Sequence, residues 1–352
     1  MSCYTGGRTI VNVTAMKNSI LREMLIDKKS RVIFDARNDY KTYKSLNSFY
    51  QIIKANNEKY SFREVDEYIS KSGLDKMYIW GNNDYSLYSY NLLKDAGYNV
   101  RGLIVNKVNA KCENDYVVEL EGVMERLNDA FIILFDRDLN DVPAEVLNQE
   151  KVLNLYSHVV GRTGNQYFDY FSALGEEYFV DAGSLDGETS MKFIKWCKGN
   201  YGAIYAFEAN PLMIDSCLKQ LKKNTIVEKL HFYGCALWNK KELVMFDNSG
   251  SKWDAHVCEE DGVIVQADSI DNLLLGRKVT FMKFDIEGSE INALTGAKNC
   301  IMQNRPRMAI SVYHNDSDLE NIMSFLIGLN LGYSFALRHY HSDSIETILY
   351  AF

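Results

Sequence analysis

The 352-residue chain has little proline and no strongly basic stretch. It contains three prolines and no Ser/Gly-rich segment, so no linker between domains stands out. Its formal net charge is -8, and its Lys and Arg residues are not clustered. Because a surface that binds polyanions needs clustered cations to neutralise phosphates, nucleic acid is not expected as a partner.

Long hydrophobic runs are also missing. No stretch approaches the roughly 18 apolar residues that a membrane span needs. The first residues, MSCYTGGRTIVNVTAMKNS, contain no continuous apolar segment of the kind that directs secretion. The seven cysteines form no CxxC pair, which favours reduced thiols over disulfides or a zinc site. We therefore expect a cytoplasmic protein without a membrane span, and its oligomeric state stays open.

The first part of the chain, residues 1–155, predicts a helical lead-in followed by a small Rossmann-like α/β domain. Helices are expected within residues 14–72 and at 85–97 and 117–129, and strands at 76–80, 98–106 and 130–135. The first turn, Gly81-Asn82-Asn83-Asp84, has one glycine where a dinucleotide-binding turn carries GxGxxG. Without the later glycines the backbone cannot approach a pyrophosphate closely. A scaffold or partner-docking role is favoured over a nucleotide site.

A second and longer alternation of strands and helices fills residues 156–352. After a predicted helix at 165–175, strands are expected at 178–183, 203–208, 229–237, 242–247, 263–268, 279–286, 307–313, 333–339 and 346–352. Helices are expected at 188–197, 211–223, 269–276, 289–303 and 317–330. A short polar turn joins the last two strands, which predicts that they are antiparallel. This is the sheet of a class I methyltransferase rather than that of a dehydrogenase.

Three strand ends suit S-adenosylmethionine. In VDAGSLDGET a buried strand ends at Asp181, and Gly183 and Gly187 bracket a tight loop that opens a helix. Glu208 ends the next strand, 27 positions later, where an α/β nucleotide site places the acid that binds ribose hydroxyls. Ala236 lies at the end of the third strand, where adenine packs against small apolar groups. These residues are our candidates for cofactor binding.

A fourth strand, in FMKFDIEGSEINALTGA, places Asp285 and Glu287 at a strand-to-helix corner. Ligands of open α/β sheets bind at the carboxyl ends of strands. His314 follows the next strand, and imidazole has an unperturbed pKa near neutrality. Asp285, Glu287 and His314 are therefore the candidate catalytic residues, with His314 as the first choice of base. Asp285 is also a candidate for cofactor binding, since Asp285 and Glu287 could instead orient the acceptor and the methionyl ammonium.

These segments carry a resemblance to a known family. FMKFDIEGSEINALTGA resembles the motif of FkbM-family methyltransferases, K-x-D-[VI]-E-G-x-E followed by a small apolar helix. VDAGSLDGETS, FEANP, SIDNLL, RPRMAISVYH and the closing RHY...ETILYAF match further landmarks in order. The resemblance covers roughly residues 178–352 and leaves the N-terminal half outside it.

The resemblance implies an S-adenosylmethionine-dependent O-methyltransferase of the class I fold. Members of the family methylate hydroxyls of sugars in glycans and of other secondary metabolites. We therefore expect a small-molecule or glycan acceptor. The resemblance assigns Asp181 and Gly183 to the cofactor loop, Glu208 to the ribose, and Asp285, Glu287 and Gly288 to the active-site corner.

Several points stay open at this stage. Carboxylate-rich corners suit magnesium or manganese, so a divalent metal is a possible additional cofactor, although no metal ligand is assigned. Two polar, aromatic segments are candidates for binding the acceptor, with Trp253 and His256 in one and His339 and Tyr340 in the other. The alternatives to a methyltransferase are a non-catalytic cofactor-binding module and a nicotinamide-dependent oxidoreductase.

Overall fold

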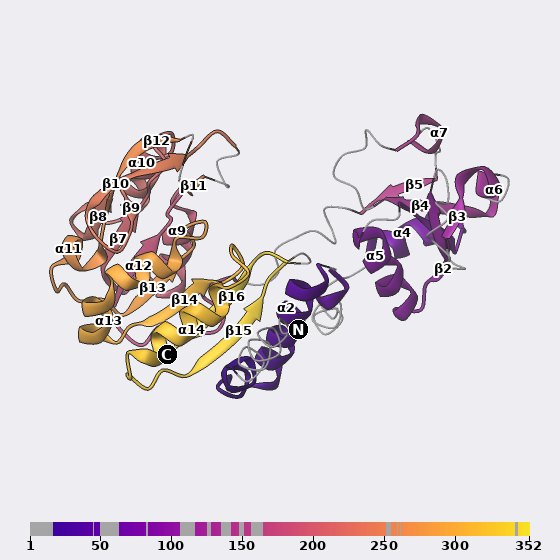
Figure 1. Ribbon diagram of the computed structural model, residues 1–352. Helices are drawn as coiled ribbons and strands as arrows, with labels where there is room; N and C mark the ends of the chain where they lie inside the picture. Colours follow the sequence, from indigo (N-terminus) through magenta and orange to yellow (C-terminus); the bar gives the residue numbers. More distant parts are fainter. Residues whose placement is uncertain are drawn as a thin grey trace, which may run out of the picture. The chain divides into compact units, whose positions relative to one another are not determined.

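A computed structural model shows how the chain folds (Figure 1). The described residues fall into two compact units. The larger unit consists of residues 1–34, 163–340 and 345–352, and the smaller unit of residues 35–162 and 341–344. Among the described residues, no helix is long and apolar enough to cross a membrane. The structure describes residues 17–44, 46–49, 63–81, 84–105, 117–124, 128–134, 142–147, 151–155, 165–250, 255–258, 260, 262–341 and 344–352.

The smaller unit is built on five parallel strands in the order β3-β2-β1-β4-β5. Its central strands β1 and β4 are apolar and almost completely buried, as parallel strands covered by helices usually are. The predicted Rossmann-like α/β unit is therefore confirmed. Its strands are β1 (Lys76–Trp80), β2 (Asn99–Val105), β3 (Val117–Glu119), β4 (Ala130–Leu134) and β5 (Val152–Asn154); the helices are α2 (Lys28–Tyr43), which begins in the larger unit, η1 (Leu46–Phe49), α4 (Arg63–Ser72), α5 (Asp84–Asp95), α6 (Leu120–Met124) and α7 (Ala144–Leu147).

Two elements of the smaller unit differ from the sequence prediction. Residues 117–129 were expected as one helix, but they begin with β3, whose valines favour an extended backbone. Strand β5 was not predicted, because three residues are too few to show a periodic pattern.

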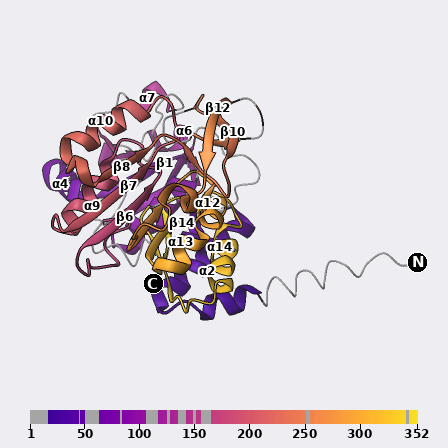
Figure 2. The same ribbon diagram turned by 90° about the vertical axis from the view of Figure 1, so that its left-hand side faces the viewer.

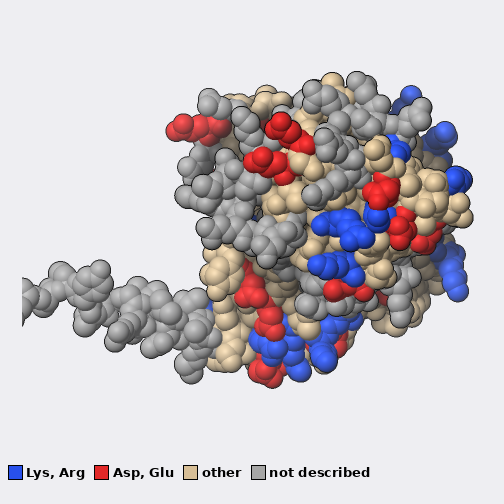
Figure 3. All heavy atoms as spheres, turned by 90° about the vertical axis from the view of Figure 1, so that its right-hand side faces the viewer, with Lys and Arg blue, Asp and Glu red and all other residues tan. Residues whose placement is uncertain are grey.

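Figure 3 shows one face of the molecule, on which Lys and Arg side chains lie beside Asp and Glu side chains.

The larger unit contains a seven-stranded sheet in the order β15-β16-β14-β13-β6-β7-β8. Strand β16 is antiparallel to both of its neighbours, and the other strand pairs are parallel. The predicted class I methyltransferase sheet with a C-terminal antiparallel strand is confirmed. The strands are β6 (Glu177–Ala182), β7 (Tyr201–Phe207), β8 (Leu230–Tyr233), β13 (Phe281–Phe284), β14 (Arg307–Ser311), β15 (Phe335–His339) and β16 (Thr347–Ala351).

A second sheet of four strands, in the order β11-β10-β12-β9, follows β8 in the chain. Residues 229–237 were expected as one strand, but β8 ends at Tyr233 and Ala236 pairs with Ala267 in this second sheet. Residues 242–247 pair antiparallel with residues 263–268 and with residues 256–258. Buried and exposed residues alternate along β12, because only one face of this sheet is covered. The strands are β9 (Ala236–Leu237), β10 (Glu242–Asp247), β11 (His256–Cys258) and β12 (Val263–Asp268).

The helices of the larger unit follow from the strand order. The chain steps from β6 to β7 to β8 in one direction and from β13 to β14 in the other, so right-handed crossovers place their helices on opposite faces. Figure 2 shows α9 and α10 beside β7 and β8, and α13 and α14 beside β14. The order reverses between β6 and β13, where open α/β sheets bind ligands. The helices are α9 (Glu188–Trp196), α10 (Ile214–Asn224), η4 (Val227–Lys229), α11 (Ile270–Leu274), α12 (Glu290–Gly296), α13 (Lys298–Asn304) and α14 (Asp318–Gly328).

The N-terminal residues of the described chain pack on the edge of the larger sheet. The Ile26 amide donates to the Phe335 carbonyl at 3.0 Å, and the Arg338 guanidinium pairs with Asp27 at 3.2 Å. Residues 1–34 therefore group with the larger unit, whereas the sequence predicts a division at residues 155 and 156. Contacts between residues about 310 positions apart cannot be read from a local pattern.

The segment before β6 is not helical, although the sequence predicts a helix at 165–175. Turns and bends fill it, and Tyr167 has a φ of 72°, a left-handed value that interrupts a helix. Phe168 of this segment contacts the rings of Phe179, Phe193, Trp196 and Phe281. The aromatic residues of the segment therefore serve the core of the larger unit.

Candidate active site

The carboxyl ends of β6 and β13 lie against each other at the point where the strand order reverses. The Asp285 amide donates to the Ala182 carbonyl at 3.2 Å. Gly183 has a φ of 86°, and a Cβ at this position would overlap the backbone of Asp285. The close approach of two backbones therefore accounts for Gly183, which the sequence assigns to the cofactor loop.

A buried ion pair holds the loop after β6. The Lys283 ammonium lies 3.4 Å from an Asp181 carboxylate oxygen. The exposed fraction is 2% for the Lys283 side chain and 0% for that of Asp181. Lys283 also donates to the carbonyls of Ala182 and Gly183, at 3.0 and 2.6 Å. Ser190 donates to Asp181 at 2.6 Å. Burial raises the pKa of Asp181, and Lys283 and Ser190 oppose that rise. Asp181, a predicted cofactor ligand, therefore lies beneath the loop and supports it.

Glu208 joins the loops after β6 and β7. Its carboxylate accepts hydrogen bonds from the amides of Leu185 and Asn210, at 2.6 and 2.7 Å. Burial raises the pKa of Glu208, and these two amides oppose that rise. Each carboxylate oxygen still has a lone pair for a further donor such as a ribose hydroxyl. Gly187, at a φ of 81°, starts α9 from the same loop.

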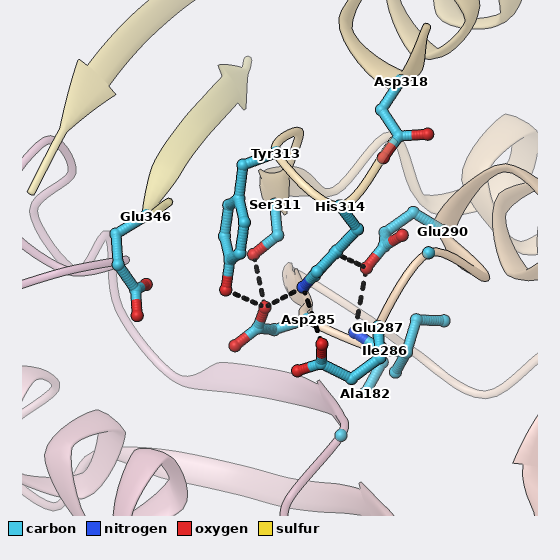
Figure 4. A network of polar contacts seen from close by, with 12 residues as sticks. Ala182, Asp285, Ile286, Glu287, Glu290, Ser311, Tyr313, His314, Asp318 and Glu346 are labelled. Carbon is cyan, nitrogen blue, oxygen red and sulfur yellow. Dashed lines mark hydrogen bonds and ion pairs between the residues drawn. The ribbon is translucent and has the colours of Figure 1, made fainter. Parts of the chain in front are cut away.

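Asp285 accepts hydrogen bonds from three side-chain hydroxyls, and Figure 4 shows those from Ser311 and Tyr313. The donors are Ser311 at 2.7 Å, Tyr167 at 2.8 Å and Tyr313 at 3.1 Å. Burial raises the pKa of Asp285, but Lys283, His314 and the hydroxyl donors outweigh it and hold that pKa below its usual value. The carboxylate is therefore ionised at neutral pH.

His314 lies among three carboxylates. Its Nδ1 is 3.0 Å from Glu290, and its Nε2 is 3.2 Å from Glu287 and 3.7 Å from Asp285. Burial lowers the pKa of His314, but these carboxylates raise it to about 11. That raised pKa favours the protonated imidazolium at neutral pH, so the arrangement favours Asp285 as the ionised group at this corner. His314 as the base stays a prediction.

Glu287 stands at a tight turn after β13. Its φ is 52° and that of Gly288 is 94°, and its side chain is 32% exposed. A Cβ on Gly288 would lie 2.9 Å from the amide nitrogen of the Asn315 side chain. The turn therefore aims a partly exposed carboxylate at His314 beside the half-buried Asp285.

Four residues of the site were missed in the sequence. Glu290 is the last Glu of the K-x-D-[VI]-E-G-x-E pattern, so the signal was present; its side chain is fully buried and accepts from the Ile286 amide at 2.9 Å. Ser311 is the last residue of β14. Tyr313 follows two residues later, directly before His314, which the sequence analysis had identified. Tyr167 has no signal, because it lies 118 positions from Asp285.

Asp285, Glu290 and His314 each offer one ligand atom, and these atoms lie within 4.8 Å of one another. Such a group is compatible with a divalent cation. However, two hydroxyls already donate to one oxygen of Asp285 and a third donates to the other. A metal at this corner therefore stays a prediction to be tested.

The remaining predicted site residues lie apart from this network. Ala236 is buried in the core of the four-stranded sheet, and His256 of β11 stands opposite Asp247. Trp253 lies outside the described residues. His339 and Tyr340 are each 4% exposed; the His339 ring contacts Thr347, and the Tyr340 hydroxyl contacts Asp169 and Tyr350. Both side chains therefore have contacts in the interior of the larger unit, and their contact with a substrate stays a prediction.

Residues 181–335 match the family model described as the methyltransferase FkbM domain. This part of the chain is an FkbM methyltransferase domain. The match includes Asp181, Glu208, Asp285 and His314, and it leaves out the smaller unit and Tyr167. The FkbM domain uses S-adenosylmethionine as its cofactor, as the sequence predicts. No curated protein sequence matches the chain.

Solved structures of methyltransferases are similar to parts of the chain. A methyltransferase FkbM from Methylobacillus flagellatus is 18% identical, with a TM-score of 0.49 over 87% of this chain and 99% of that one. The fibrillarin of Aeropyrum pernix, solved with S-adenosyl-L-methionine, is 10% identical, with a TM-score of 0.34 over 51% of this chain and 66% of that one. An SAH-bound methyltransferase of Podospora anserina is 9% identical, with a TM-score of 0.31 over 50% and 70% of the two chains.

Proposed function

We propose that the chain transfers the methyl group of S-adenosylmethionine to a hydroxyl oxygen of a sugar, in the biosynthesis of a glycan or polysaccharide. Asp285 carries this proposal. It is an ionised carboxylate at the carboxyl edge of the methyltransferase sheet, and its three side-chain partners are all hydroxyls. A carboxylate in such surroundings is suited to bind one more O–H group and to orient it for reaction.

The residues around the sheet edge fit the cofactor. S-adenosylmethionine supplies a methyl group on a positively charged sulfur. At one corner the acidic side chains of Asp285, Glu287 and Glu290 outnumber the basic side chain of His314, which they surround. An excess of negative charge stabilises a nearby sulfonium. Glu208 is the residue that we expect to hold the ribose, through the lone pairs that its backbone partners leave free.

Asp285 is the group that we expect to hold the acceptor. The Tyr313 hydroxyl, at 3.1 Å, is the longest of its three contacts, so an acceptor hydroxyl can replace it at the smallest cost. Holding the acceptor oxygen in line with the methyl carbon accelerates the transfer by proximity. Removal of the hydroxyl proton by a positioned base adds roughly a hundredfold to ten-thousandfold. His314 then serves as a fixed cation that keeps Asp285 ionised.

The choice of a sugar rests on the resemblance to FkbM-family methyltransferases rather than on a described pocket. Members of that family methylate sugar hydroxyls and hydroxyls of other metabolites. The ring of a sugar presents several hydroxyls, which carboxylates such as those of Asp285 and Glu287 can accept as hydrogen-bond donors. The acceptor is therefore to be identified by screening.

Calorimetric titration with S-adenosylhomocysteine tests the cofactor site. We expect saturable binding by the wild type, binding weakened about tenfold or more by Glu208→Ala through loss of charged hydrogen bonds, and no binding of NAD. Glu228→Ala, which removes an exposed acid of η4, is the matched control and should bind as the wild type does. A protein that binds NAD but not S-adenosylhomocysteine would instead be a nicotinamide-dependent oxidoreductase.

Transfer of a radiolabelled methyl group from S-adenosylmethionine tests the reaction itself. Monosaccharides, nucleotide sugars and oligosaccharides are offered as acceptors, and the product is treated with mild base. A labelled product that survives base is a methyl ether of a hydroxyl, whereas a methyl ester is hydrolysed. Binding of S-adenosylhomocysteine without transfer to any acceptor would favour the non-catalytic cofactor-binding module.

A further inference from the structure

Tyr167 belongs to the segment before β6, outside residues 181–335 of the FkbM domain. Its hydroxyl nevertheless donates to Asp285 at 2.8 Å. We propose that Tyr167 is a positioning residue for methyl transfer, so that the active site includes the segment before the FkbM domain. The proposal deepens the proposed function and rests on it, since the role of Asp285 in transfer comes from there.

The backbone of Tyr167 is held in an unfavourable conformation. Its φ of 72° is uncommon for any residue with a Cβ and rarer still for a bulky one. Such conformations persist where the surroundings determine them, and they cluster at active sites. The strain points its ring toward the interior, where Tyr167 is 6% exposed and the Lys283 ammonium lies 5.6 Å from the ring centre.

Each neighbour of Tyr167 is fixed as well. Gln166 donates to Glu346, and the Tyr167 amide donates to the Tyr350 hydroxyl at 3.2 Å. Phe168 packs in the aromatic core, and Asp169 accepts from Tyr340. Four consecutive residues are therefore tied to the core and to the C-terminal hairpin of β15 and β16. A side chain on so fixed a segment can hold Asp285 in one orientation.

The surroundings of Asp285 determine that Tyr167 is the donor and Asp285 the acceptor of this hydrogen bond. Burial and the charge of Asp285 raise the pKa of Tyr167 well above its usual value, so its hydroxyl keeps its proton and always donates. Loss of this donor leaves the carboxylate less stabilised and raises its pKa. The other titratable groups that face Asp285 or share its surroundings are Lys283, His314, Glu287, Glu290, Tyr313, Asp181 and Glu346.

The test compares Tyr167→Phe with Tyr170→Phe in the full-length chain. Tyr170→Phe removes a hydroxyl from the same segment, where the ring stacks on Tyr350 and not on the site. For Tyr167→Phe we expect kcat to fall about tenfold, the value of roughly one hydrogen bond to a charged group, with an unchanged KM for S-adenosylmethionine. The acid limb of the pH–rate profile should move to higher pH.

A second measurement does not depend on turnover. Carboxyl-labelled aspartate gives a ¹³C NMR titration of Asp285, which Asp285→Asn assigns by the loss of its signal. We expect Tyr167→Phe to raise the pKa of Asp285 and Tyr170→Phe to leave it unchanged, while both variants melt at similar temperatures.

Two results would overturn the proposal. One is a Tyr167→Phe protein with the wild-type kcat and Asp285 titration. The other is a fall in kcat that follows a lower melting temperature, with the pKa of Asp285 unchanged, which would make Tyr167 merely structural. If the wild type transfers no methyl group to any acceptor, the proposed function fails, and the NMR titration still decides whether Tyr167 holds Asp285.

Discussion

The five-stranded sheet of the smaller unit and the seven-stranded sheet of the larger unit share a reversal of strand order and have different edges. In the smaller unit the strand order reverses between β1 and β4, as it reverses between β6 and β13 in the larger unit. The described carboxyl end of β1 is Trp80, whose carbonyl accepts from Ser86 at 2.8 Å, and β4 ends at Leu134. The β6 and β13 ends carry Asp181 and Asp285. A reversal of strand order thus provides a place for a site, and charged residues at the strand ends provide its chemistry.

The largest effect should come from removing the carboxylate that distinguishes the two edges. Asp285→Asn keeps the shape of the side chain and loses its charge, so we expect methyl transfer to slow by roughly a hundredfold to ten-thousandfold. Ser86→Ala, at the corresponding edge of the smaller unit, should leave the rate unchanged. Steady-state kinetics with a saturating acceptor measure both variants. Equal losses in the two would show that the edges do not differ in function.

The buried ion pair of the larger sheet should dominate its stability. Lys283→Met leaves Asp181 buried without its cation, and we expect the free energy of unfolding in urea to fall by about 3–5 kcal/mol. The double variant Lys283→Met/Asp181→Asn should recover part of that loss, since no charge remains buried. If Lys283→Met were as stable as the wild type, Lys283 would not stabilise the buried charge of Asp181, contrary to what their contacts indicate.

The ionisation of His314 should make the stability of the protein depend on pH. Its folded pKa is raised to about 11 from an ordinary value of 6.5. The imidazolium therefore contributes stability that is complete below about pH 6.5 and is lost as pH rises toward 11. We expect His314→Asn to be about 1–3 kcal/mol less stable than the wild type near pH 6, with a smaller difference at pH 9. A constant difference would mean that His314 is neutral in the folded protein.

The smallest effect should follow removal of divalent metal. Because hydroxyls already donate to both oxygens of Asp285, we expect the rate of methyl transfer to be the same with EDTA as with magnesium or manganese. His314, rather than a metal ion, is then the cation beside the carboxylates of this corner. A rate that falls in EDTA and returns with manganese would instead make Asp285, Glu290 and His314 metal ligands.

The local patterns of the sequence predicted much of the fold and the site residues that lie at the ends of strands. Periodicity identified the strands that end at Asp181, Glu208 and Asp285, because alternation and helical spacing are properties of neighbouring residues. It failed where the partner of a segment is distant. Residues 229–237 read as one strand, yet Ala236 pairs with Ala267 in another sheet, and residues 165–175 read as a helix until the contacts of Tyr167 and Phe168 are known.

The sequence by itself determined which acids stand at the ends of strands, because the carboxyl ends of parallel strands meet at one edge of a sheet. Only the tertiary structure decided what those acids do there. Burial set Asp181 beneath the loop with Lys283, and three carboxylates surround His314 and raise its pKa. Charge and burial depend on every group within a few ångströms, and Tyr167 reaches Asp285 from 118 positions away.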